Sequence, residues 1–156
     1  QKEYTKPVHC SLEELWKGCT KKLKVFYPTT GEKIYNIHIK PGWKEGTKIK
    51  FPSSRSTNSN TGMEVEYPPI TFIVHEKKHP FLQHVGNDLI WKCKLTSRQA
   101  EKGAKLRLPL PDGSTLEVES KKDTRSREQL RVHGRGIPMK SGQKGDVLIE
   151  FIVVNH

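Results

Sequence analysis

Residues 11–26 read Ser-Leu-Glu-Glu-Leu-Trp-Lys-Gly-Cys-Thr-Lys-Lys-Leu-Lys-Val-Phe, and this stretch decides how the chain begins to fold. Ser11 and Glu14 have the spacing of a capping box, in which each side chain accepts a hydrogen bond from the backbone N–H of the other residue. Gly18 is expected to end the helix in the left-handed conformation that glycine adopts readily. The stretch therefore predicts one short helix, ended by a glycine.

After the glycine, the hydrophobic period changes from that of a helix to that of a strand. From Thr20 onward, Leu23 and Val25 fall on one face, and Lys22 and Lys24 fall on the other. Strict alternation of this kind predicts a half-buried β-strand. Such a strand packs into a core, or it offers an apolar groove with a cationic rim to an extended peptide, and the alternation alone leaves both readings open.

The same alternation, separated by turn signals, recurs along the chain and predicts an all-β protein. Polar residues at 52–69 predict a mobile loop, because serine, asparagine, threonine and proline dominate there. Further strands are expected at residues 35–39, 47–51, 70–74, 105–110, 116–118 and 146–154.

The second half of the chain repeats the first in outline. Thr96, Gln99 and Gly103 have the spacing of the first helix signal, 85 positions later, and a strand signal again follows. A repeat of this length indicates a duplicated domain, because solenoid repeats are much shorter. We therefore predict two tandem β-sandwich-like domains, each with one short helix, at residues 1–78 and 79–156.

Amino-acid composition indicates the cellular compartment of the protein and the charge of its binding partners. The 156 residues include 28 Lys and Arg against 17 Asp and Glu, which gives a formal charge of +11 and favours acidic partners in general. The three cysteines lack C-x-x-C spacing, so neither a disulfide framework nor a zinc site is expected. We expect a reducing, cytoplasmic location, and we expect no membrane association, because no apolar run reaches membrane-spanning length.

No motif of catalysis stands in the context that it requires. Residues 75–79, His-Glu-Lys-Lys-His, match the letters of the zinc-binding H-E-x-x-H motif, but that motif binds zinc from a helix, and here it follows the strand expected at 70–74. Neither a P-loop nor a G-x-S-x-G motif occurs. We therefore predict no enzyme activity, no catalytic residue, no metal and no cofactor. Binding of single-stranded nucleic acid is the alternative, since a basic β-rich domain can stack bases on aromatic residues. We expect no nucleic-acid partner, because the candidate aromatic residues do not share one basic face: Trp16, Tyr35, Trp43 and Trp91.

Several blocks of sequence, in order, resemble the C-terminal part of the DnaJ family of J-domain heat-shock co-chaperones. The first is the stretch quoted above, followed by Ile-Lys-Pro-Gly-Trp-Lys-Glu-Gly-Thr-Lys-Ile-Lys-Phe at 39–51 and His-Pro-Phe-Leu-Gln-His-Val-Gly-Asn-Asp-Leu-Ile at 79–90. Pro-Asp-Gly at 111–113, Gly-Arg-Gly-Ile-Pro at 134–138 and Gly-Asp-Val-Leu-Ile-Glu-Phe at 145–151 continue it. The resemblance covers nearly the whole chain.

Departures from the family pattern narrow the resemblance to one class. No C-x-x-C-x-G-x-G repeats interrupt the first domain, which is similar to class II, the type B members without zinc. The His-Pro-Asp loop of the J domain, the Gly/Phe-rich linker and the helical segment through which members form homodimers are not recognised in these residues. We expect this chain to bind without stimulating ATP hydrolysis, and we expect homodimers only of the full-length protein.

The resemblance also implies a binding site and its partners. Family members bind unfolded client proteins and the acidic Glu-Glu-Val-Asp tail of the 70-kilodalton heat-shock chaperone by strand addition at the first domain, which supports protein folding. Carried over by position, the peptide-binding pocket consists of Val8, Leu23, Val25 and Phe72, and Lys6 stands where members often have an aliphatic residue. The acidic tail is expected at Lys21, Lys22, Lys24 and Lys77, with Lys33 as a further candidate. Without the resemblance, the apolar residues are better explained as ordinary core, and the lysines as a solvated edge that discourages aggregation.

Overall fold

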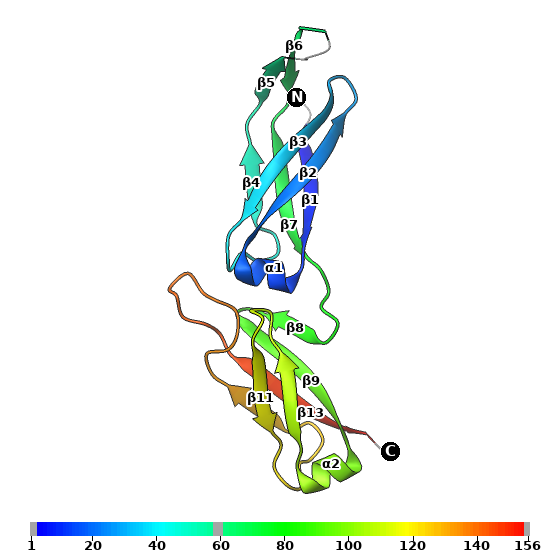
Figure 1. Cartoon of the computed structure of the whole chain (residues 1–156), viewed down its shortest axis with the longest axis vertical. Coiled ribbons are helices and arrows are strands. Elements are labelled where there is room, and N and C mark those ends of the chain that lie inside the picture. The colour runs from blue at the N-terminus through cyan, green and yellow to red at the C-terminus, as the bar shows by residue number, and fades with distance from the viewer. Residues whose placement is uncertain (1–2, 58–60, 155–156) are drawn as a thin grey trace. The chain divides into compact units, whose positions relative to one another are not determined.

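The computed structural model describes residues 3–57 and 61–154. The chain divides into two compact units, Gln1–Lys77 and Lys78–His156. Strands make up about half of the described residues, and each unit contains one short helix, so the all-β class is confirmed (Figure 1).

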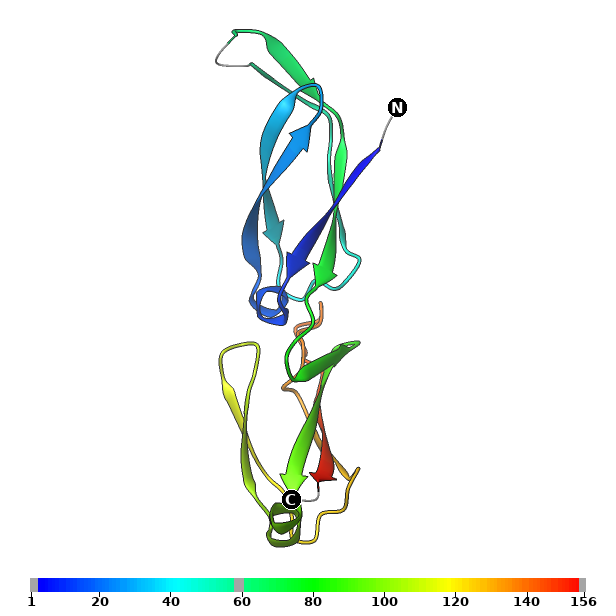
Figure 2. The same ribbon diagram turned by 90° about the vertical axis from the view of Figure 1, so that its right-hand side faces the viewer.

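The first unit contains two layers of strands. Its larger sheet has three strands in the order β1-β7-β4, with β1 parallel to β7, and the other layer is the hairpin β2-β3. Figure 2 shows this hairpin on one side of the unit and β7 on the other. The elements are β1 (Tyr4–Cys10), α1 (Leu12–Lys17), β2 (Cys19–Tyr27), β3 (Gly31–Ile39), β4 (Lys48–Phe51), β5 (Ser54–Thr57), β6 (Glu64–Tyr67) and β7 (Ile70–Glu76).

Side chains from both layers form one hydrophobic core. Phe72 of β7 is fully buried, and its ring lies edge-on to those of Tyr35 and Phe51, with centroids 5.2 and 5.6 Å away. The hydroxyl groups of Tyr27 and Tyr35 are 2.6 Å apart, so the buried polar atoms of the two tyrosines satisfy each other. The core therefore joins the hairpin to the three-stranded sheet.

The predicted capping box of α1 is present. The Ser11 N–H donates to Glu14 Oε1 at 2.8 Å, and the Glu14 N–H donates to Ser11 Oγ at 3.1 Å. Gly18 ends the helix as predicted but is not in the left-handed helical conformation, since its φ of 79° is combined with a ψ of 155°. This extended mirror-image conformation is almost exclusive to glycine, and it leads the chain directly into β2.

The second unit repeats this plan. A four-stranded sheet has the order β12-β13-β9-β8, with β13 parallel to β9, and β10-β11 is the facing hairpin. Its helix has the same cap, in which the Thr96 N–H donates to Gln99 Oε1 at 2.9 Å. The elements are β8 (Leu82–Val85), β9 (Asp88–Thr96), α2 (Ser97–Lys102), β10 (Lys105–Pro109), β11 (Thr115–Glu119), β12 (Gln129–Val132) and β13 (Val147–Val154).

The expected mobile loop at 52–69 was wrong for most of its described residues. Strands β5 and β6 pair there in antiparallel register, and they extend beyond the other strands of this unit at the end opposite α1 (Figure 1). Tyr67 is buried and Val65 packs against the core, so two apolar residues anchor an otherwise polar hairpin. Residues 58–60 lie outside the described part of the chain.

Candidate peptide-binding groove

Two neighbouring strands of the first unit each leave one edge open. β1 is the outer strand of the three-stranded sheet, and β2 pairs only with β3. Among residues 3–57 and 61–154, no strand pairs with the second edge of either. The backbone therefore offers hydrogen-bonding groups to an additional strand at this place.

A small pocket of about 240 Å³ lies between these strands. It is lined by Lys6 and Pro7 of β1, by Leu23, Lys24 and Val25 of β2, and by Phe72 of β7. A space of this size accommodates a single side chain, and its lining is apolar apart from the two lysines.

Three of the four predicted pocket residues line this pocket. Leu23 is half-buried, whereas Val25 and Phe72 are 2% and 0% exposed, so these two form its floor. Val8 is also buried, at 1% exposure, and belongs to the core beneath the pocket without lining it. Leu23 is therefore the predicted pocket residue best placed to contact a ligand directly.

The two open edges differ in the hydrogen bonds that they can offer. The Lys77 N–H donates to the carbonyl of Cys10, so Cys10 directs its backbone groups toward β7. Because successive residues of a strand face opposite sides, Thr5, Pro7 and His9 direct theirs toward the open edge. Pro7 has no N–H, which interrupts the row of donors on β1. β2 contains no proline over its nine residues and is the better template for a peptide.

Two of the predicted acidic-tail lysines already have carboxylate partners. Lys21 Nζ lies 2.7 Å from Glu14 Oε2, and Lys24 Nζ lies 3.5 Å from Glu32 Oε2. The hydrogen bond to Glu14 raises the pKa of Lys21, although partial burial of the ammonium opposes this. Burial works against a low pKa at Glu14, yet the hydrogen bonds from Lys21 and Ser11 hold it below the usual value. A bound acidic peptide would have to compete with Glu14 for Lys21.

The other two predicted lysines are exposed and lie outside the pocket lining. Lys22 points to the outer face of β2, and Lys77 follows the end of β7. Burial raises the pKa of the Cys10 thiol, and the charges of Lys21 and Lys77 both act to lower it. Lys21 and Lys77 therefore lie near the same thiol, at the α1 end of the unit.

Lys6 and Lys33, the two further lysines considered for the groove, have different positions. Lys6 lines the pocket. Lys33 is bonded to the hydroxyl of Ser54, and its ammonium lies 5.2 and 4.8 Å from the ring centroids of Tyr35 and Tyr67. Lys33 therefore does not belong to the lining of the groove, whereas Lys6 is a pocket residue that sequence reasoning had left undecided.

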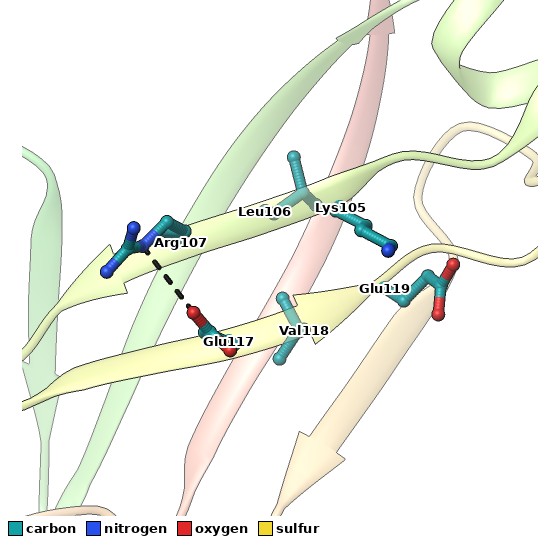
Figure 3. A pocket seen from close by; sticks show the side chains of 6 residues that line it. All are labelled: Lys105, Leu106, Arg107, Glu117, Val118 and Glu119. Atoms are coloured by element: carbon teal, nitrogen blue, oxygen red, sulfur yellow. Dashed lines mark ion pairs between the residues drawn. The ribbon is translucent and has the colours of Figure 1, made fainter.

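The second unit carries a larger depression on its hairpin, of about 510 Å³ (Figure 3). Leu106 and Val118, register partners on β10 and β11, form its apolar part. Arg107 and Glu117 beside them form an ion pair with a 3.7 Å separation. The positive and negative charges of this lining are equal in number, so it lacks the cationic excess of the groove in the first unit.

The described residues show neither a metal centre nor a transmembrane helix. No three His, Cys, Asp or Glu side chains within residues 3–57 and 61–154 are grouped as metal ligands. In the same residues, neither helix is long and apolar enough to cross a bilayer. Of the aromatic residues considered for base stacking, Trp16 and Tyr35 are 6% and 5% exposed and are therefore covered by the fold.

The family model for the DnaJ C terminal domain matches residues 4–155. The chain belongs to this family. The DnaJ domain shares 35% identity over 154 residues with DnaJ protein homolog 1 of Drosophila melanogaster, covering 90% of this chain and 44% of that protein. Identity is 32% over 156 residues with Protein psi1 of Schizosaccharomyces pombe (94% and 40% covered) and 30% over 155 residues with human DnaJ homolog subfamily B member 5 (92% and 43%).

These relatives place the chain in class II, the type B members, so the predicted recognition is confirmed. The chain spans about two fifths of the length of the curated relatives that it matches. No C-x-x-C repeat occurs in its sequence, in agreement with the zinc-free class.

Proposed function

We propose that the first unit binds extended peptide segments, both of unfolded client proteins and of the acidic tail of a 70-kilodalton heat-shock chaperone, as part of a co-chaperone that supports protein folding. The observation that carries this proposal is the 240 Å³ pocket beside the open edge of β2. Strand addition provides backbone hydrogen bonds that do not depend on sequence, while the pocket selects one side chain. This combination produces broad specificity with a preference at one position.

The lysines provide the attraction for an acidic tail. Lys21 and Lys24 lie three residues apart on β2, which corresponds to about 10 Å along a strand. A tail with several carboxylates therefore reaches both lysines when it lies along this edge. Lys22 and Lys77 are exposed and add to the local positive potential.

The expected affinity is modest. Burying one aliphatic side chain contributes roughly 1.5–3 kcal/mol, and each exposed ion pair contributes about 0.2–1 kcal/mol. Association and ordering of the peptide oppose these gains, so a dissociation constant in the micromolar range, about −8 kcal/mol, is the tightest that we expect. Weak binding suits a protein that transfers its client to a partner.

For the full-length protein, we propose a cytoplasmic co-chaperone that acts as a homodimer and has no enzyme activity of its own. The family to which the chain belongs supports the co-chaperone role. The basic excess of the chain supports an acidic partner.

An NMR titration tests the proposal. We would add a Glu-Glu-Val-Asp peptide to isotope-labelled protein and follow the amide resonances at about 0.05 M and 0.3 M salt, because screening weakens contacts between exposed charges. Perturbations should concentrate in β2 and α1, and the double variant Lys21→Ala/Lys22→Ala should bind more weakly, most clearly at low salt. The double variant Lys92→Ala/Lys94→Ala is the control for net charge, because it removes two exposed lysines from β9 in the second unit. Perturbations confined to the second unit would refute the assignment of the site.

A further inference from the structure

The inner face of β1 contains one charged residue, and it lies in the pocket. Residues 4, 6, 8 and 10 share this face, where Val8 and Cys10 are buried and Tyr4 is partly buried. Lys6 is the register partner of Phe72, so its side chain leaves the strand toward the same face as that buried ring. Its long aliphatic stem can pack beside the pocket while the ammonium stays in water.

The ammonium of Lys6 is available to a ligand. Within residues 3–57 and 61–154, it forms neither an ion pair nor a hydrogen bond. Lys24, the other lysine of the pocket, is paired with Glu32. A carboxylate that enters the pocket therefore meets one cation that has no competing partner.

Comparison with the second unit argues against a structural need for this lysine. At the position 85 residues later, β9 carries Trp91, whose parallel register partner on β13 is Ile149. The equivalent strand thus accepts an apolar aromatic residue where β1 has Lys6. The charge at this site is a property of the first unit and not of the duplicated fold.

We propose that Lys6 determines specificity by selecting an acidic side chain for the pocket, an inference that rests on the proposed peptide-binding function. A glutamate places its methylene groups against Leu23 and Val25 and its carboxylate beside the Lys6 ammonium. The pocket prefers glutamate to glutamine, because the two side chains have the same shape and differ in charge. Aspartate is a poorer ligand, since its shorter stem does not reach both parts of the pocket.

Labelled peptides with one variable residue test this inference. We would measure fluorescence anisotropy with Gly-Val-Thr-X-Thr-Val-Gly, where X is glutamate, glutamine or leucine. For the unmodified chain, the glutamate peptide should bind about 1.4- to fivefold more tightly than the glutamine peptide, which is the range of an exposed ion pair. This ratio should decrease at high salt, because ions screen an exposed pair.

Substitution of Lys6 assigns the preference to one residue. Lys6→Met keeps the stem and removes the charge, so the glutamate to glutamine ratio should fall to about one, and Lys6→Arg should restore it. Lys48→Met removes a charge from an exposed position of β4 in the same unit and should leave the ratio unchanged. Denaturant unfolding of Lys6→Met should match that of the unmodified chain, because within the described residues the ammonium forms neither a hydrogen bond nor an ion pair.

The outcomes separate this inference from the proposed function. If all three peptides bind and the ratio is the same with and without Lys6, peptide binding stands and the role of Lys6 is refuted. If Lys48→Met lowers the ratio as much as Lys6→Met, the preference comes from general charge, and the role of Lys6 is refuted as well. If none of the peptides binds to any variant, the peptide-binding function fails together with this inference.

Discussion

Replacing Glu14 with glutamine should strengthen the binding of an acidic peptide. Glu14 has two roles, since Oε1 accepts the Ser11 N–H at 2.8 Å and Oε2 lies 2.7 Å from Lys21 Nζ. Glutamine retains an acceptor for the Ser11 N–H, as Gln99 does in the equivalent cap of α2. Glu14→Gln therefore preserves the helix cap and releases the ammonium of Lys21.

The size of the effect follows from the exposure of the pair. The side chains of Lys21 and Glu14 are 23% and 32% exposed, so the pair is partly screened by solvent. Pairs of this kind are worth about 0.2–1 kcal/mol, which corresponds to an affinity gain of about 1.4- to fivefold when a ligand no longer competes with Glu14. Titration calorimetry or NMR with a Glu-Glu-Val-Asp peptide measures this gain.

A matched control separates release of Lys21 from a change in net charge. Glu117→Gln removes the same charge from β11 in the second unit, where Glu117 is paired with Arg107. It should alter the affinity much less than Glu14→Gln does. Equal gains for the two variants, or no gain for Glu14→Gln at about 0.05 M salt, would show that Glu14 does not restrain Lys21 against a ligand.

The same pair makes a prediction for acid stability. The pKa of Glu14 is lower in the folded chain than its ordinary value of 4.5. Its contribution to the free energy of unfolding is therefore complete above about pH 4.5 and is lost as the pH falls through the lower folded value. Urea unfolding as a function of pH should show a shallower acid decline for Glu14→Gln, and an unchanged slope would contradict this assignment.

Three further substitutions or reactions test the packing of the chain. Phe72→Ala should lower the free energy of unfolding by about 3–5 kcal/mol, since the ring is fully buried. In a denaturant titration, this variant should lose peptide binding at the same denaturant concentration at which it unfolds. Gly18→Ala should lower the free energy of unfolding more than Gly46→Ala does. Both glycines have a positive φ, but only at Gly18 would an added Cβ lie 2.9 Å from the Ile39 carbonyl oxygen. Comparable losses of stability for the two variants would contradict this. Burial raises the pKa of the Cys93 thiol to about 11, so a thiol reagent at pH 8 should modify it only as the chain unfolds, and rapid labelling of native protein would refute its protection.

Local signals in the sequence predicted the elements that local chemistry determines. The spacing of Ser11 and Glu14 was sufficient for the first cap, and the alternation after Gly18 was sufficient for β2, because both depend on neighbours a few residues away. The strand β1 was not predicted, since Thr5, Lys6 and Pro7 are all exposed and interrupt the apolar alternation. Its parallel partner β7 is about 66 residues away in sequence, and no local pattern encodes that pairing.

The site was predictable only in part for a related reason. Alternation placed Leu23, Val25 and Phe72 on inner faces, but it did not show which of them a ligand can reach. Exposure at the pocket depends on where the open edges of β1 and β2 meet, which is a property of the tertiary fold. The ion pair between Glu14 and Lys21 joins the helix to the strand and likewise requires the folded geometry.

The duplication within the chain distinguishes what the fold requires from what the first unit adds. Both helix caps have the same geometry, yet Gln99 replaces Glu14 and Leu106 stands at the position of Lys21, so the second unit forms the same cap without the ion pair. The pair is therefore not needed to end the helix or to start the strand that follows. Because the fold can omit this pair, we expect it to serve the proposed peptide binding, in which Glu14 would hold Lys21 in place and limit its attraction for acidic chains.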